Sequence, residues 1–136
     1  MSKSNATETD LVAYIFTSVA IPWATIPNIY ISLHTADPGE TGNQSTSEAT
    51  YTSYARTTVA RTSAGWSIGT GTATNAALIS CPQCTGGSNT ITYVGLGTTA
   101  TGTGQLLYSG ALNSSLTVSN LITPQFAALA LTVTED

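Results

Sequence analysis

The chain has 136 residues, a formal net charge of −4 at pH 7 and a sequence pI near 4.5. Only 7% of its residues are charged, against about 25% in a typical domain, and Lys3, Arg56 and Arg61 are its only lysine and arginine side chains. So few cations exclude electrostatic binding to nucleic acid or to an anionic membrane surface. With His34 as the single histidine and seven acidic residues, we expect no metal, no cofactor and no enzymatic activity.

The polar residues of the chain are mostly hydroxyls. The sequence has 26 Thr and 15 Ser, together with 12 Gly and 5 Pro. Thr is β-branched and fits strands better than helices, while Gly and Pro supply turns. Hydrophobic residues make up 41% of the chain, which is enough for a core. Composition and length therefore predict one all-β domain, which we place at residues 9–136.

The N-terminal region is expected to differ from the rest. Residues 1–8 are polar, and we predict a flexible arm there, either a frayed terminus or a segment that becomes ordered on a neighbouring subunit. A short helix is predicted to follow over about residues 9–21, since Leu11, Ile15 and Val19 would share one apolar face.

Signals at both ends bound this predicted helix. Thr7 followed by Asp10 resembles a capping box, and Pro22 cannot continue a helix. The apolar stretch at 11–23 is shorter than the roughly 20 residues that cross a bilayer. Acidic Glu8 and Asp10 precede it where a signal peptide carries positive charge, so we interpret it as a folded helix.

Beyond the helix the hydrophobic pattern changes to a period of two. Residues 29–34 alternate between Ile or Leu on one side and Tyr, Ser or His on the other. Further strands are predicted at 51–61, 66–68, 73–80, 90–96, 105–108, 116–118 and 126–133. About eight short strands separated by turns predict a jelly-roll-like β-sandwich, although an immunoglobulin-like topology fits the same pattern.

Two segments between the strands carry candidate chemistry. Residues 36–49 begin with a turn at 37–40 and continue as a long polar loop. Cys81 and Cys84 form a Cys-x-x-Cys pair. A structural zinc site needs four ligands and only His34 remains, while a redox pair is expected at the start of a helix. We therefore interpret this pair as part of a turn with two thiols.

His34 and two arginines are the remaining candidates. Serine catalysis needs a Ser–His–acid geometry and an oxyanion hole, and the sequence has no G-x-S-x-G motif, so we place His34 on the polar face of a strand. Arg56 and Arg61 are each expected to have a carboxylate partner, either on another subunit or within the fold. The carboxylates considered within the fold are Asp37, Glu40 and Glu48.

The order of the segments resembles a known family. The segments that carry the resemblance are a helix at 11–16, the strand and turn at 28–42, Tyr54-Ala55-Arg56, Trp66, 90–96 and 104–112. Together, from about Leu11 to Val133, they resemble a family of small tailed-bacteriophage virion proteins, whose genes are often labelled tail fibre. Its members with a clear role are jelly-roll cement, or head-decoration, proteins on the outside of the capsid. The Cys81 and Cys84 pair departs from the family pattern.

The resemblance implies a virion protein without catalytic residues or cofactor. We expect a capsid cement protein that binds the major capsid protein on the outer surface of the phage head. It would associate with itself as a dimer or trimer, and it would be made in the host bacterial cytoplasm. The alternative is a tail or tail-fibre component that binds a host receptor, and in neither case is nucleic acid or a membrane a partner. The candidate interface residues are Ser2, Lys3, Asp37, Glu40, Glu48, Arg56 and Arg61.

Overall fold

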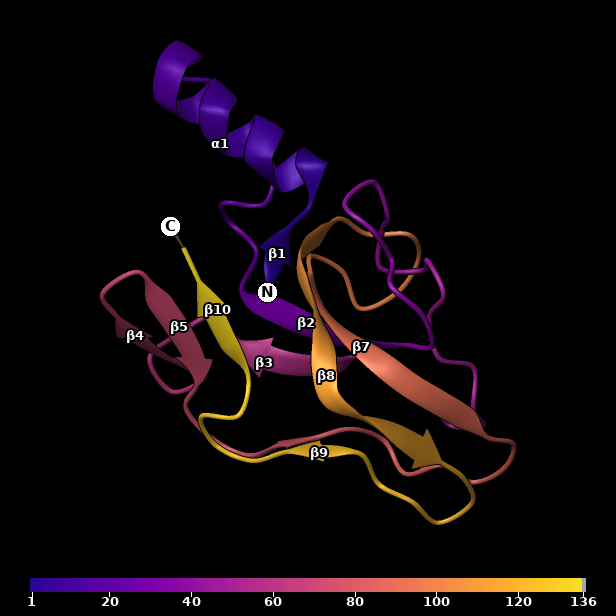
Figure 1. The fold of residues 1–136 in the computed structure, drawn as a ribbon. Coiled ribbons are helices and arrows are strands. Elements are labelled where there is room, and N and C mark those ends of the chain that lie inside the picture. The colour runs from indigo at the N-terminus through magenta and orange to yellow at the C-terminus, as the bar shows by residue number, and fades with distance from the viewer. Residues whose placement is uncertain (136) are drawn as a thin grey trace.

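The computed structural model describes residues 1–135 and has an all-β sandwich with one helix in that range, as the sequence predicts (Figure 1). Asp136, the last residue of the predicted domain, lies outside the described residues. The largest sheet has the order β1-β8-β7-β2-β3, with every neighbouring pair antiparallel. Its strands are β1 (Ser2–Lys3), β8 (Leu106–Val118), β7 (Asn89–Gly97), β2 (Asn28–His34) and β3 (Thr57–Ala60).

Two smaller antiparallel sheets complete the sandwich. One has the order β10-β5-β4 and the other is a β6-β9 pair. Their strands are β4 (Trp66–Gly69), β5 (Thr72–Asn75), β10 (Thr132–Thr134), β6 (Ile79–Ser80) and β9 (Gln125–Phe126).

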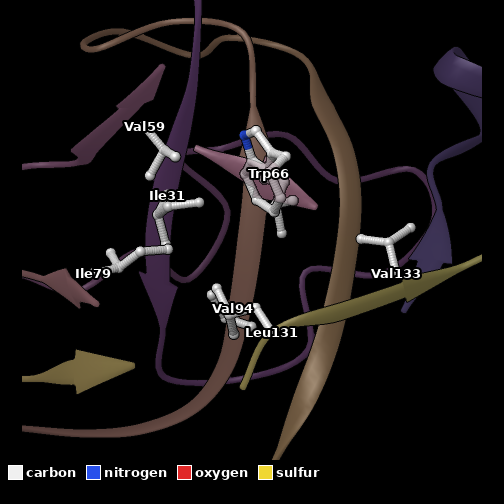
Figure 2. Close-up of a cluster of buried hydrophobic side chains, with 8 residues drawn as sticks. Ile31, Val59, Trp66, Ile79, Val94, Leu131 and Val133 are labelled. Carbon is white, nitrogen blue, oxygen red and sulfur yellow. The ribbon is translucent and has the colours of Figure 1, made fainter. Parts of the chain in front are cut away.

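Two clusters of apolar side chains form the core. The first joins the large sheet to the three-stranded sheet, as Figure 2 shows for Ile31 and Val94 on the former and Trp66 and Val133 on the latter. Alternate residues of a strand face the same side, so Ile31 and Leu33 of β2 lead from the first cluster to the second. The buried members of the second cluster are Leu33, Ala49, Tyr51, Cys81, Cys84, Ile91 and Val118.

The N-terminal region differs from the prediction. Residues 2 and 3 form β1, which pairs with β8 at the edge of the large sheet, and α1 (Asn5–Thr17) begins directly after Ser4. The segment predicted as a flexible arm, 1–8, is therefore a strand followed by the first turn of the helix. The helix begins at residue 5 rather than 9 and ends at residue 17 rather than 21. No helix in the described part of the chain is long and apolar enough to span a membrane.

Ser4 explains the earlier start of the helix. Its hydroxyl accepts a hydrogen bond from the Thr7 N–H at 3.3 Å and donates one to the Leu106 carbonyl of β8 at 2.5 Å. A serine N-cap stabilises a helix by about 1 kcal/mol, and the contact with β8 adds to it, so Ser4 prevails over the predicted Thr7–Asp10 capping box. At the other end, Ser18 adopts a left-handed conformation with φ of 56°, which ends the helix before the proline.

Other strand predictions also change. Residues 73–80 divide between β5 and β6, and residues 126–133 divide between β9 and β10. Of residues 51–61 only β3 is a strand, because Ser53 has a φ of 75° that interrupts the extended backbone. Residues 105–108 and 116–118 were predicted as separate strands, yet β8 runs continuously across both regions. It stays extended through an irregularity in its pairing with β7, between Ile91 and Tyr93. The small and polar residues of this stretch lack the alternation that marks a strand.

Candidate functional site

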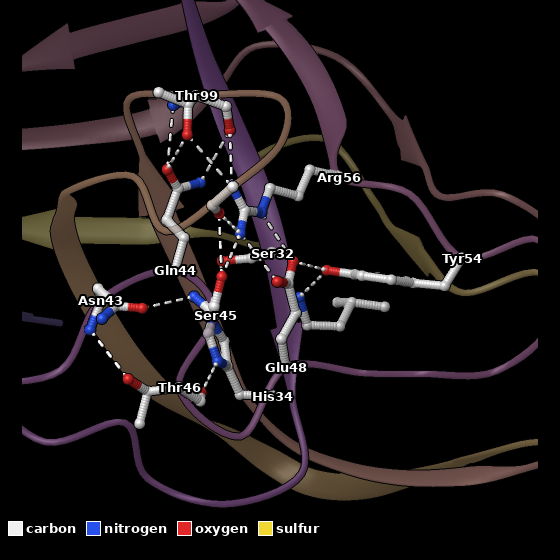
Figure 3. A network of polar contacts seen from close by, with 12 residues as sticks. Ser32, His34, Asn43, Gln44, Ser45, Thr46, Glu48, Tyr54, Arg56 and Thr99 are labelled. Atoms are coloured by element: carbon white, nitrogen blue, oxygen red, sulfur yellow. Dashed lines mark hydrogen bonds and ion pairs between the residues drawn. The ribbon is translucent and has the colours of Figure 1, made fainter.

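Polar side chains gather under the loops at one end of β2 (Figure 3). The loop predicted at 36–49 folds back along the strand, with the Ala49 N–H bonded to the Leu33 carbonyl and the Thr35 N–H to the Ser47 carbonyl, both at 2.8 Å. The loop therefore covers the strand end instead of standing free in solvent. We call the group beneath it the polar cluster, and its members are Ser32, His34, Gln44, Ser45, Glu48, Tyr54, Arg56 and Thr99.

Arg56 is at the centre of the polar cluster. Its Nε and Nη2 atoms donate to the two carboxylate oxygens of Glu48 at 2.7 and 2.8 Å. Nη1 donates to the Thr99 carbonyl at 3.1 Å, and Nη2 donates to the Gly102 carbonyl at 2.7 Å. The Arg56 side chain is only 3% exposed and that of Glu48 17%. A bidentate pair whose other donors are also bonded is the arrangement in which burial of two charges is tolerated.

Gln44 joins the long loop to the loop after β7. Its side-chain oxygen accepts hydrogen bonds from the N–H groups of Thr98 and Thr99, both at 3.0 Å, while its amide nitrogen donates to the Thr99 carbonyl at 3.2 Å. Two glycines leave space for this side chain. A Cβ at Gly97 would lie 2.0 Å from the Gln44 Cδ, and one at Gly104 would lie 2.1 Å from its Oε1. Close approach of the backbone to a buried amide therefore explains both glycines.

His34 lies on the polar face of β2 as predicted, but that face is buried. Both His34 and Ser32 are 0% exposed, because the two loops cover them. The ring Nδ1 lies 2.7 Å from the Thr46 carbonyl, which can only accept, so Nδ1 carries the proton. Nε2 then accepts from the Ser32 hydroxyl at 2.8 Å. Burial lowers the pKa of His34 below its usual range, which keeps the ring neutral in the fold.

The Ser32–His34 pair resembles part of a catalytic triad in spacing alone. In a triad a carboxylate orients the second ring nitrogen, whereas here a backbone carbonyl does so. A Cβ at Gly95 would lie 2.7 Å from both the His34 Nε2 and the Ser32 Oγ, so the neighbouring strand closes over the pair. The two hydrogen bonds of His34 connect β2 to the long loop, and the Ser32 hydroxyl is not accessible to solvent.

Tyr54 connects the polar cluster to the strand. Its hydroxyl donates to Glu48 Oε1 at 2.8 Å and accepts the Leu33 N–H at 3.1 Å. Burial raises the pKa of Tyr54 well above its usual range, so the hydroxyl stays protonated as a donor. Every member of the polar cluster thus bonds to another member or to a loop backbone, and together they fix the two loops on β2.

The candidate interface residues divide into two groups. Glu48 and Arg56 are partners of each other within the fold, with Arg56 buried and Glu48 partly exposed. This answers the question left open by the sequence, because the carboxylate partner of Arg56 lies within the fold. The other five candidates also reach the surface at least in part, and they are Ser2, Lys3, Asp37, Glu40 and Arg61.

Four of these surface residues lie around the N-terminal strand and the turn of the long loop. Lys3 Nζ pairs with Glu135 Oε2 at 2.6 Å, and the Ser2 hydroxyl donates to Glu40 at 3.4 Å. Asp37 accepts the N–H of the glycine two residues on at 2.8 Å, which is an Asx turn. The structure therefore brings the N-terminal strand and the loop turn together, as a joint candidate for surface contact.

Arg61 has no carboxylate partner among the described residues of its own chain, so only the alternative of a partner on another subunit stays a prediction. In the described residues its guanidinium donates to the carbonyls of Trp23 and Ala24 at 3.0 and 2.8 Å, and it lies 5.9 Å from the Trp23 ring centroid. The Trp23 indole N–H in turn donates to Asp10 of α1 at 2.8 Å. Arg61 therefore fixes the segment that returns from the helix to β2.

The two cysteines were predicted in a turn, but they lie in an irregular segment after β6 whose N–H groups at Cys81 and Cys84 bond to the carbonyls of Pro124 and Ile122, both at 2.9 Å. Both thiols are free and buried. The Cys84 thiol donates to the Gly86 carbonyl at 3.2 Å, and burial raises the pKa of the Cys81 thiol. Burial also raises the pKa of the adjacent Tyr51 to about 12. Within residues 1–135, no group of three or more His, Cys, Asp or Glu side chains is placed to hold a metal ion.

Two surface features were not predicted from the sequence. The apolar residues of the helix are solvent-exposed in its second half, with Phe16 79% and Ile15 68% accessible. An open apolar groove of about 1070 Å³ lies between the large and three-stranded sheets, with Trp66, Ile68 and Val133 in its lining. The periodicity of the helix indicated its apolar residues, but it could not show whether they contact the protein or the solvent. A groove between two sheets produces no local pattern in a sequence.

Comparison with known proteins adds one finding. Residues 2–134 match the model of the Gp80 family, described as "Podophage GP4 fiber I protein gp80". No curated protein matches the chain. The match covers almost the whole sequence, including the N-terminal strand, the helix and all three sheets.

Proposed function

The chain belongs to the Gp80 family of podophage fiber I proteins, and on that premise we propose that it is a structural subunit of a phage fibre. A phage virion protein is what both the family and the sequence resemblance indicate. Of the two roles considered from the sequence, the family description favours the fibre component over the capsid cement protein. The observation that carries the proposal is the family match over residues 2–134.

The structure supports a role in protein–protein contact rather than in catalysis. The polar groups that resemble a reactive centre are buried and bonded to one another in the polar cluster. The accessible surface includes an apolar end of the helix and an apolar groove, which are typical of protein–protein contact. We propose that the protein is not an enzyme and acts by binding other virion proteins, including copies of itself.

A capsid cement role is the second candidate. It is supported by the resemblance to head-decoration proteins and by a surface with few charges to desolvate, which suits contacts repeated over a shell. In this role the protein would bind the major capsid protein on the outer surface of the head. The N-terminal strand and the loop turn at Asp37 and Glu40 would be its contact region.

Electron microscopy of immunogold-labelled virions decides between the two roles. Antibodies against the purified chain should place gold on fibres, away from the outer shell of the head. Gold spread evenly over the head would overturn the fibre assignment in favour of the cement role. Labelling of neither structure, in virions that contain the protein by mass spectrometry, would contradict both.

The fibre role has a second consequence that can be measured. A fibre subunit that contributes to host binding should make adsorption sensitive to antibody fragments against it. We expect such monovalent fragments to slow adsorption of phage to host cells, with fragments against the major capsid protein as the control. Unchanged adsorption at saturating fragment would remove host binding from the proposal and leave a purely structural role.

A further inference from the structure

The first half of helix α1, residues 5–10, is mostly polar and contacts the rest of the molecule, whereas residues 11–16 are almost entirely apolar. Thr7 is buried, and Asp10 bonds to the returning segment and to Gln105 of the body. Val12, Ile15 and Phe16 lie about 140–240° around the helix from Asp10, at 3.6 residues per turn. They are 57%, 68% and 79% exposed. We call these three residues the apolar stripe, and it points away from the sheets.

The helix is held firmly at one end and projects at the other. Gln105 donates to Thr7 at 3.2 Å and to Asp10 at 2.9 Å, which fixes the first turns. The remainder extends beyond the sheets (Figure 1). Isolated helices shorter than about 12–15 residues are marginal in water, and α1 has 13 residues. A projecting helix with a bare apolar stripe is therefore expected to pack against something outside its own chain.

The groove between the sheets is the corresponding unfilled surface. Its volume, about 1070 Å³, is above the roughly 300–1,000 Å³ of small-molecule pockets and suits several large side chains. Trp66, Leu107 and Val133 belong to its lining, together with Ile68 and Leu129, which are 75% and 61% exposed. An apolar surface of this kind marks a contact site in a soluble protein.

We propose that the apolar stripe of one copy inserts into the groove of a second copy. A second copy is favoured as the occupant because every chain carries both halves of the contact. The stripe cannot fill its own groove without breaking the Asp10 hydrogen bonds, since these hold it facing outward. The groove lining contains Arg61 and Glu135, and Glu135 is paired with Lys3 at 2.6 Å while Arg61 bonds to neutral carbonyls. The uncompensated charge of the lining is therefore positive, which suits Glu8, one helical turn before Val12.

This contact is head to tail, since each copy donates one helix and accepts another. Such contacts close into a ring where the rotation between copies permits it. The inference goes beyond the proposed function, because it holds wherever the protein lies on the virion. It also identifies the surface by which the self-association expected from the sequence takes place.

The first test measures the mass of the full chain in solution by light scattering after size exclusion. We expect the wild-type protein to be an oligomer. Phe16→Asp and Ile68→Asp should each weaken association by more than about tenfold. The matched controls are Thr17→Asp, at the same end of the helix but off the stripe, and Thr70→Asp, on the β4–β5 turn outside the groove lining. A monomeric wild-type protein, or equal effects of test and control variants, would overturn the proposal.

The second test identifies the partners directly by disulfide cross-linking. A chain with Phe16→Cys is mixed with a chain with Ile68→Cys, oxidised and separated on a non-reducing gel. We expect a linked pair in the mixture and none in either chain alone, with the wild-type chain as the control for Cys81 and Cys84. A link formed by the Phe16→Cys chain alone would show helix packing on helix, and would overturn insertion into the groove.

Discussion

At the scale of single residues, the few charges of this chain have large structural roles. Arg56 was expected from its rarity to have one particular carboxylate partner, and Glu48 is that partner. The sequence could not predict that the pair is buried, because burial depends on residues 36–49 folding over a strand far from Arg56 in sequence. Gln44 was missed altogether, since a single glutamine in a polar loop carries no distinguishing pattern.

Replacing Arg56 should leave the Glu48 carboxylate largely buried without its cation. We expect Arg56→Met to lower the free energy of unfolding by about 3–5 kcal/mol, the usual cost of breaking a buried pair from one side. The measurement is the urea midpoint with its slope. Arg61→Met is the control, and it should cost less than about 1 kcal/mol because Arg61 is exposed. Equal losses in the two variants would contradict the assignment of Arg56 as the internal partner.

His34 should make stability depend on pH. Burial lowers its pKa in the folded state, so the unfolded chain binds the proton more readily. Stability should therefore be constant above the unfolded pKa of about 6.5 and fall as the pH drops from there to the folded pKa. Urea midpoints measured across this range should decline in the wild-type protein and stay flatter in His34→Gln. A wild-type protein that becomes more stable on acidification over this window would refute the buried neutral ring.

At the scale of elements, alternation predicted strands well where one face is buried. Residues 29–34 were predicted close to β2 because their apolar residues repeat every second position, and residues 90–96 were predicted close to β7. Alternation did not predict the elements that are defined by tertiary contacts. The edge strand β1 has two residues and no periodicity, and only its pairing with β8 defines it. The apolar face of α1 was found in the sequence, but the side of the helix that contacts the body is set by Thr7 and Asp10.

The N-terminal strand and cap should matter for folding as well as for contact. Deleting residues 1–8 would expose the edge of β8 and leave the Leu106 carbonyl without the Ser4 and Thr7 hydroxyls. We expect a clear drop in melting temperature for this deletion, and a loss of about 1–2 kcal/mol for Ser4→Ala. Thermal unfolding followed by circular dichroism measures both. A deletion variant as stable as the full chain would mean that the segment is an independent arm.

At the scale of the whole molecule, a charge fraction of 7% limits the effect of salt on the contacts that the protein makes. Contacts made by apolar and hydroxyl groups are little affected by screening, which shortens the Debye length to about 3 Å at 1 M salt. We expect the protein to stay on virions at about 1 M salt and neutral pH as fully as at low salt. Sedimentation of the virions followed by quantitative gel analysis measures its retention. Release under these conditions would indicate an attachment that depends on ion pairs.

The ion pair between Lys3 and Glu135 has a practical consequence for those who handle this protein. Its two atoms, Lys3 Nζ and Glu135 Oε2, are 2.6 Å apart, so it connects β1 to the residue that follows β10, near the base of α1. Peptides fused to the two termini would thus emerge from neighbouring parts of the surface, separated by the length of two side chains. A short linker between the ends would circularise the backbone while keeping every strand in place.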